Sequence, residues 1–179
     1  GIGTTAIQMA TALGVKVIAT AGSDEKCAMC ESLGAVKAIN YNDHDFVSES
    51  LRITGIGVDV ILDMVGGDYV QKNFNACAPK ARIISIAFLR GSKVEVDLMP
   101  LMLKQLVITG STLRSQPLEN KARIAKGVEN NVWPLIEKQQ FKPITDNTFA
   151  LTDASDAHKL MESNKHIGKI LLVANSTKG

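Results

Sequence analysis

A glycine-rich run at the start of the 179-residue chain has the residue types and spacing of a phosphate-binding loop. The run is Gly1-Ile2-Gly3-Thr4-Thr5-Ala6, a G-x-G-x-x-A pattern. Glycines let the backbone approach a pyrophosphate closely, and the N–H groups at the start of the following helix stabilise its charge. The pattern predicts that Gly1, Ile2, Gly3 and Thr4 bind a dinucleotide, with an ordinary glycine-rich helix start as the alternative.

The end of the next apolar run bears on which dinucleotide would bind. Folds that prefer NAD place Asp or Glu at this tip to bind the ribose 2′-hydroxyl, whereas Thr20-Ala21-Gly22-Ser23 offers no acid. The Ser23 hydroxyl and Lys26, one turn further on, could bind a 2′-phosphate, which favours NADPH. The alternative is that Ser23 is only a helix cap and Lys26 a solvated charge. Asp24 and Glu25 could repel a phosphate, or simply stabilise the helix dipole.

Two later loops, each at the end of an apolar run, would complete the site. Ligands bind at the carboxyl ends of parallel strands, so the runs Val65-Gly66-Gly67 and Ile86-Ala87-Phe88 are predicted to flank the nicotinamide and its ribose. Apolar walls exclude water from hydride transfer, although each residue could instead serve packing or a turn. Asp63 is interpreted as a structural acid at a strand end. No nucleophile–base pair or carboxylate pair is evident, so catalytic residues stay unknown, as hydride transfer by a cofactor permits.

The cysteines and histidines do not predict a metal site. Cys27 and Cys30 form a C-x-x-C pair inside an expected helix, and a zinc site needs further ligands. The remaining candidates lie far apart in sequence: Cys77, His44, His158 and His166. Three cysteines, an odd number, also argue against a disulfide framework.

The elements that must position these residues alternate between strand and helix. Apolar strands are expected at 15–21, 38–41, 58–63, 81–86 and 106–112, with helices between them. This alternation predicts an α/β fold with a doubly wound parallel sheet of Rossmann type that lacks its first strand. Residues 1–118 would form this dinucleotide-binding domain. Residues 119–179 would form helices and strands, including an unpartnered strand at 168–173, that dock on a domain preceding Gly1.

Composition excludes several other classes of protein. The net charge of +2 and the mixing of basic with acidic residues argue against a nucleic-acid partner. No apolar run reaches membrane-spanning length, so no membrane association is expected. We expect a cytoplasmic protein.

Several short runs resemble the medium-chain dehydrogenase/reductase superfamily, and in particular its zinc-independent NADPH:quinone oxidoreductase branch. The runs are Ser23-Asp24-Glu25-Lys26, Leu33-Gly34-Ala35, Ile39-Asn40-Tyr41, Asp63-Met64-Val65-Gly66-Gly67, Ala157-His158-Lys159-Leu160-Met161-Glu162 and His166-Ile167-Gly168-Lys169-Ile170. The resemblance implies that the Tyr41 hydroxyl also approaches the 2′-phosphate and that Asn164 reaches back to the cofactor. It also implies an N-terminal GroES-like domain that has no counterpart in this sequence.

The expected activity is hydride transfer from NADPH to a quinone or related conjugated carbonyl by the complete chain. An enone or enoyl-thioester reductase of the same superfamily is the alternative within the enzymes. A non-catalytic nucleotide-binding or assembly module is the alternative outside them. These 179 residues alone are expected to be inactive, because one wall of the substrate pocket would come from the GroES-like domain.

The run Leu106–Thr112 predicts the edge of the sheet and a homodimer. It carries neither a proline nor a charge, so its unpaired N–H and C=O groups invite another strand. A two-fold pairing of two copies would satisfy them, and the resemblance implies the same interface. The alternative is that residues 113–117 fold back over this edge.

Overall fold

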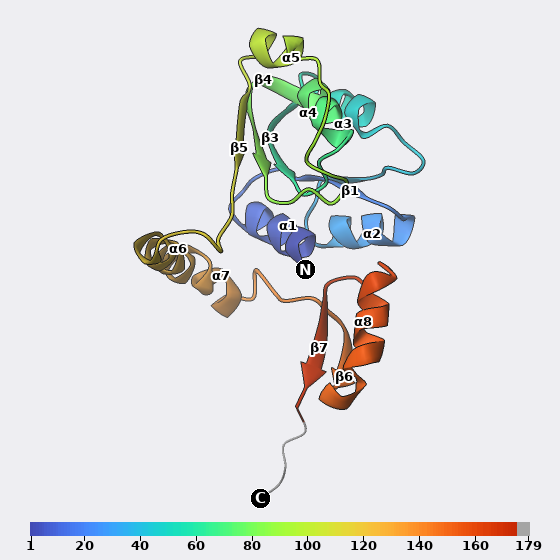
Figure 1. Cartoon of the computed structure of the whole chain (residues 1–179), viewed down its shortest axis with the longest axis vertical. Coiled ribbons are helices and arrows are strands. Elements are labelled where there is room, and N and C mark those ends of the chain that lie inside the picture. The colour runs from blue at the N-terminus through green and yellow to red at the C-terminus, as the bar shows by residue number, and fades with distance from the viewer. Residues whose placement is uncertain (175–179) are drawn as a thin grey trace, which may run out of the picture. The chain divides into compact units, whose positions relative to one another are not determined.

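The computed structural model describes residues 1–174, in which helices alternate with strands (Figure 1). The chain divides into two compact units. The first comprises Gly1–Ala38 and the chain from Lys126 onward, and the second comprises Ile39–Ala125. No helix among the described residues is long and apolar enough to cross a membrane. The functional division expected at residue 118 stays a prediction.

The first unit begins with helix α1 (Ile2–Ala12), strand β1 (Ile18–Ala21) and helix α2 (Asp24–Ser32). Strand β2 (Lys37–Asn40) follows and forms a two-stranded sheet with β1. The turn after α2 needs glycine, because Gly34 has φ of 109° and a Cβ there would lie 2.6 Å from Thr11 Cγ2. The Thr11 hydroxyl donates to the Gly34 carbonyl at 3.1 Å, so α1 packs directly on this turn.

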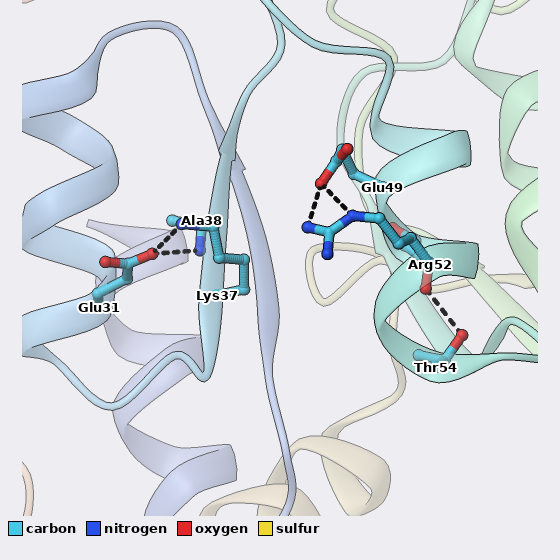
Figure 2. Close-up of polar contacts among 7 residues, drawn as sticks. Glu31, Lys37, Ala38, Glu49, Arg52 and Thr54 are labelled. Carbon is cyan, nitrogen blue, oxygen red and sulfur yellow. Dashed lines mark hydrogen bonds and ion pairs between the residues drawn. The ribbon is translucent and has the colours of Figure 1, made fainter.

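A carboxylate joins the end of α2 to the strand that follows. Glu31 Oε1 accepts from the Ala38 backbone N–H and from Lys37 Nζ, each at 3.0 Å, as Figure 2 shows. The Ala38 N–H and then Lys37 hold the pKa of Glu31 below its usual range. In the second unit, Arg52 makes two hydrogen bonds to Glu49 Oε2 one helical turn away (Figure 2).

The C-terminal part of the first unit contains a parallel strand pair. After helix α6 (Leu118–Asn131), which spans the boundary between the units, come α7 (Trp133–Glu137), β6 (Thr145–Ala150), the 3₁₀ turn η1 (Leu151–Asp153), α8 (Ala154–Glu162) and β7 (Lys169–Val173). β6 pairs with β7 in parallel, with Thr148 opposite Leu171. The prediction of an unpartnered strand at 168–173 was therefore wrong. The partner strand is largely polar and exposed, so it lacks the apolar run by which the other strands were recognised.

A buried glutamine joins this C-terminal part to α1. Gln8 Nε2 donates to the Lys142 carbonyl at 3.0 Å, and the Lys142 N–H donates to Gln8 Oε1 at 3.0 Å. The reciprocal pair satisfies the side-chain amide and the backbone groups of Lys142 together. The segment before β6 is thus fixed to the helix that carries the glycine-rich run.

The second unit is built around a parallel sheet. Its elements are α3 (Phe46–Thr54), β3 (Val58–Asp63), α4 (Tyr69–Ala76), β4 (Cys77–Ser85), α5 (Met99–Leu103) and β5 (Val107–Gly110). The strand order is β3-β4-β5, and both pairings are parallel, with Ile83 opposite both Ile61 and Ile108. The predicted α/β class with parallel strands is confirmed, although the described strands are divided among three sheets.

A lysine side chain binds backbone carbonyls beside the hydrophobic core of this unit. Phe74, Cys77, Ala81, Ile83 and Leu106 form the buried cluster. Lys104 Nζ donates to the carbonyls of Phe74, Asn75 and Cys77 at 3.1, 2.9 and 2.8 Å. These carbonyls belong to the last turn of α4 and the residue after it, where the helix leaves acceptors unsatisfied and where positive charge is favourable.

We expect Lys104→Met to destabilise the protein by about 2 kcal/mol, because three acceptors at a helix C-terminus lose their charged donor. The matched control is Lys93→Met, which removes the same charge from an exposed loop. Urea unfolding measures both. Equal free energies of unfolding for the two variants would show that Lys104 is not a structural cap.

Candidate functional site

The glycine-rich run forms the start of α1. Gly1 is the N-cap, and its carbonyl accepts from the Thr5 N–H at 3.2 Å and from Thr4 Oγ1 at 3.1 Å. At Gly3, a Cβ would meet no atom within 4 Å, so the space beside this backbone is open. Ile2 is exposed. The Gly1 amino group donates to the Gly168 carbonyl at 3.1 Å. Beyond Gly1, the first N–H groups of a helix have no partner within the helix, which fits the approach of a pyrophosphate.

The end of β1 leads into a capped helix without an intervening acid. β1 ends at Ala21, and Ser23 is the N-cap of α2, with its Oγ accepting from the Lys26 N–H at 3.3 Å. Asp24 and Glu25 lie in the first turn of this helix. The residues at this tip therefore fit a 2′-phosphate through a hydroxyl, helix N–H groups and an ammonium.

Two predicted site residues that lie 138 positions apart in sequence meet in the first unit. Lys26 Nζ donates to the backbone carbonyl of Asn164, which follows the C-terminus of α8. Lys26 was predicted from its charge and Asn164 from the resemblance alone. The contact uses the Asn164 backbone, whereas the Asn164 side-chain Nδ2 donates to the Glu162 carbonyl at 3.4 Å.

In the second unit, Asp63 organises the loop after β3. Its Oδ1 accepts from the N–H groups of Val65 at 2.8 Å and Gly66 at 3.3 Å. The side chain is buried, and its Oδ2 has no hydrogen-bond partner among the described residues. These contacts agree with the interpretation of Asp63 as a structural acid at a strand end.

The loops after β3 and β4 run side by side. The Ile86 N–H donates to the Asp63 carbonyl at 2.8 Å, and the Arg90 N–H donates to the Val65 carbonyl at 2.8 Å. Backbone hydrogen bonds therefore join the two loops beyond the strand ends, although not in the register of the strands. They bring Val65 alongside the segment that holds Ile86, Ala87 and Phe88, all predicted to flank the nicotinamide.

The sequence predicted Gly66 at the site as part of the run Val65-Gly66-Gly67, and the loop depends on this glycine. Gly66 has φ of 66°, and a Cβ there would lie 2.7 Å from the Gly91 carbonyl oxygen and 2.8 Å from Phe88 Cδ1. Any side chain would separate the two loops. The signal was the double glycine that ends the run Asp63–Gly67. Phe88 itself is 51% exposed and leaves an aromatic surface at the edge of the sheet.

Tyr41 belongs to the second unit, directly after β2, and is 41% exposed. Ser23 and Lys26 belong to the first unit. The joint role of the three residues at a 2′-phosphate stays a prediction.

The thiols do not fit a zinc site. Burial is the main cause of the raised pKa of the Cys27 and Cys30 thiols. Burial also raises the pKa of Cys77, to about 11. Within residues 1–174, no three His, Cys, Asp or Glu side chains gather as potential metal ligands.

Parallel strands, crossover helices and loops gathered at strand ends define an α/β unit of the dehydrogenase type. The chain belongs to the zinc-binding dehydrogenase family, whose sequence pattern matches residues 1–128. The predicted resemblance to the quinone oxidoreductase branch of the medium-chain dehydrogenase/reductase superfamily is confirmed.

Three known proteins illustrate the relationship. The crystal structure of Escherichia coli quinone oxidoreductase complexed with NADPH superimposes with a TM-score of 0.84 at 29% identity, covering 97% of this chain and 54% of that one. The 2-haloacrylate reductase of a Burkholderia species is 28% identical over 97% of this chain and 52% of its own length. Quinone oxidoreductase-like protein 2 of Bos taurus is 30% identical over 89% of this chain and 46% of its own length. The chain thus spans about half the length of each of these three proteins.

We expect Asp63→Ala to accelerate amide hydrogen exchange at Val65 and Gly66 by roughly tenfold or more, because both N–H groups lose their acceptor. Asp63→Asn keeps Oδ1 and should change exchange much less. The control is Asp59→Ala, an exposed carboxylate on the same strand. Unchanged exchange in Asp63→Ala, measured by NMR, would show that the carboxylate does not hold the loop.

Proposed function

We propose that the chain binds NADPH and forms the dinucleotide-binding part of an oxidoreductase that reduces a quinone or related conjugated carbonyl without zinc. The proposal rests on the tip after β1: no acid stands between Ala21 and the start of α2, and Ser23 and Lys26 present a hydroxyl and an ammonium there. The NADPH complex of the E. coli quinone oxidoreductase supports the same cofactor. Residues 1–118 are proposed as the NADPH-binding domain and 119–179 as the segment that docks on a GroES-like domain.

The residues of the chain have binding and positioning roles. NADPH, when bound, supplies the hydride. The start of α1, from Gly1 to Thr4, binds the pyrophosphate through backbone N–H groups. The paired loops at Val65 and Ile86–Phe88 hold the nicotinamide end against apolar side chains and exclude water. No side chain of the described residues is assigned a proton-transfer role.

The substrate class rests on the relatives. Quinone reduction is favoured by the E. coli quinone oxidoreductase. An enone or enoyl-thioester reductase is the second candidate, favoured by the 2-haloacrylate reductase, which matches the same share of the chain at 28% identity. Rates of NADPH consumption with a quinone, an enone and an enoyl thioester distinguish the two. The cytoplasmic location expected from the sequence stays a prediction.

We expect Lys26→Ala to weaken NADPH binding about tenfold and to leave NADH binding unchanged, because only the 2′-phosphate interacts with this charge. The matched control is Lys16→Ala. Lys16 is exposed and precedes the start of β1, whereas Lys26 follows its end. Calorimetry with both nucleotides makes the measurement. Equal affinity of Lys26→Ala and the parent for NADPH would contradict the assignment.

The free edge of β5 supports the proposed homodimer. Among the residues that the structure describes, β5 pairs with β4 alone in the order β3-β4-β5, and Val107 and Ile108 are exposed. The Ser111 N–H donates to the Ser85 carbonyl at 3.0 Å, on the β4 side. Because N–H directions alternate along a strand, the Ile108 N–H points to the free edge and the Thr109 N–H points to β4.

We expect Ile108→Pro to convert a dimer to a monomer while the fold persists, because it removes an outward donor. Thr109→Pro should instead disturb the β4–β5 pairing and lower stability. Sedimentation velocity at micromolar concentration, with circular dichroism as the check on folding, separates the two effects. A parent that sediments as a monomer with its sheet intact would rule the dimer out.

A further inference from the structure

We propose that Asn164 is a positioning residue for the 2′-phosphate site, because its backbone carbonyl holds the Lys26 ammonium beside the start of α2. The inference rests on the proposed NADPH binding and adds a residue that sets nucleotide selectivity. Both residues belong to the first unit.

The backbone of Asn164 has an uncommon conformation that directs this carbonyl. Asn164 follows α8 with φ of 55°, in the left-handed region, and its N–H donates to the Met161 carbonyl at 3.2 Å. Helices commonly end on such a residue, and asparagine is the side chain besides glycine that tolerates it best. The left-handed residue turns the chain, and its carbonyl oxygen accepts from Lys26 Nζ.

The side chain of Asn164 is engaged within its own turn. Its Nδ2 donates to the Glu162 carbonyl at 3.4 Å, and the neighbouring Ser163 Oγ donates to the Leu160 carbonyl at 2.7 Å. These bonds fix the end of α8. The contact with Lys26 therefore depends on backbone conformation, and an amide side chain is useful mainly because it permits that conformation.

Lys26 is held at both ends. Its N–H donates to the Ser23 Oγ at 3.3 Å, and its ammonium donates to the Asn164 carbonyl. A free lysine side chain loses rotamer entropy when it is ordered, and the carbonyl contact removes part of this loss from ligand binding. The carbonyl carries no formal charge, so this contact is a hydrogen bond and not an ion pair. Among the described residues the ammonium makes this one hydrogen bond, so two of its three N–H donors can reach phosphate oxygens.

The test compares two substitutions of Asn164 that separate backbone from side chain. Asn164→Gly removes the amide and keeps the left-handed conformation accessible, whereas Asn164→Val strongly disfavours that conformation. The probes are adenosine 2′,5′-bisphosphate and AMP, which differ by the 2′-phosphate, with affinities measured by calorimetry. Asn164→Val should weaken bisphosphate binding roughly fivefold and leave AMP unchanged, whereas Asn164→Gly should stay near the parent.

Two controls keep the result specific. Gln139 also has a positive φ, 58°, after another helix, α7, so Gln139→Val makes the same backbone change away from the pair and should not alter bisphosphate affinity. Adding Asn164→Val to Lys26→Ala should cause no further loss, because the carbonyl acts through the ammonium. Unchanged AMP affinity shows that each variant is folded.

Three outcomes overturn the proposal. Equal weakening by Asn164→Gly and Asn164→Val would assign the effect to the amide side chain. An unaffected Asn164→Val beside a weakened Lys26→Ala would leave NADPH binding standing and remove the role of Asn164. If neither the parent nor Lys26→Ala binds the bisphosphate more tightly than AMP, the protein does not recognise the 2′-phosphate. The proposed function then fails, and the role of Asn164 fails with it.

Discussion

The parallel pairing of β3 with β4 is the constraint on which the second unit depends. Parallel strands have their carboxyl ends at the same edge of the sheet, so the loops that leave them are neighbours from the start. Here backbone hydrogen bonds join the two loops that follow, since the Ile86 and Arg90 N–H groups donate to the Asp63 and Val65 carbonyls. Asp63 closes the turn from within by accepting two further N–H groups. Position at this edge is therefore set by backbone hydrogen bonds.

A backbone-built edge explains why its side chains can be apolar. Val65, Ile86 and Ala87 are half-buried and contribute no charge, because the polar groups that fix the loops are N–H, C=O and one carboxylate. Hydride transfer needs orientation and a dry surface more than it needs an acid or a base. The absence of a nucleophile–base pair from the sequence therefore agrees with the proposed chemistry.

The sequence predicted features that depend on neighbouring residues. The sequence offered Ser23 as a helix cap, beside its possible role at a 2′-phosphate, and its Oγ accepts the Lys26 N–H as such a cap should. The run Asp63–Gly67 marked a strand end followed by a tight turn. Both signals are local, because capping and turn formation involve residues within about four positions of one another.

Features that depend on distant residues were missed or wrong. β6 is polar over Thr145–Thr148, and its pairing with β7 relies on backbone groups that every sequence possesses. No periodicity could identify it, so 168–173 was predicted to lack a partner. The contact of Lys26 with the Asn164 carbonyl likewise could not be identified from local sequence. It joins a side chain to a backbone atom, and the resemblance suggested the residue but not the atom.

Lys26 and Lys104 differ in how many of their ammonium N–H donors are hydrogen-bonded, and this difference separates a binding role from a structural one. Lys104 donates to three carbonyls near the end of α4, so all three of its protons are used and the charge serves the fold. Among the described residues, Lys26 donates its ammonium to one carbonyl, that of Asn164. One bond is enough to orient the ammonium and too few to satisfy it. A lysine in that condition favours an anion with several oxygens, and a phosphate monoester on the ribose has that chemistry.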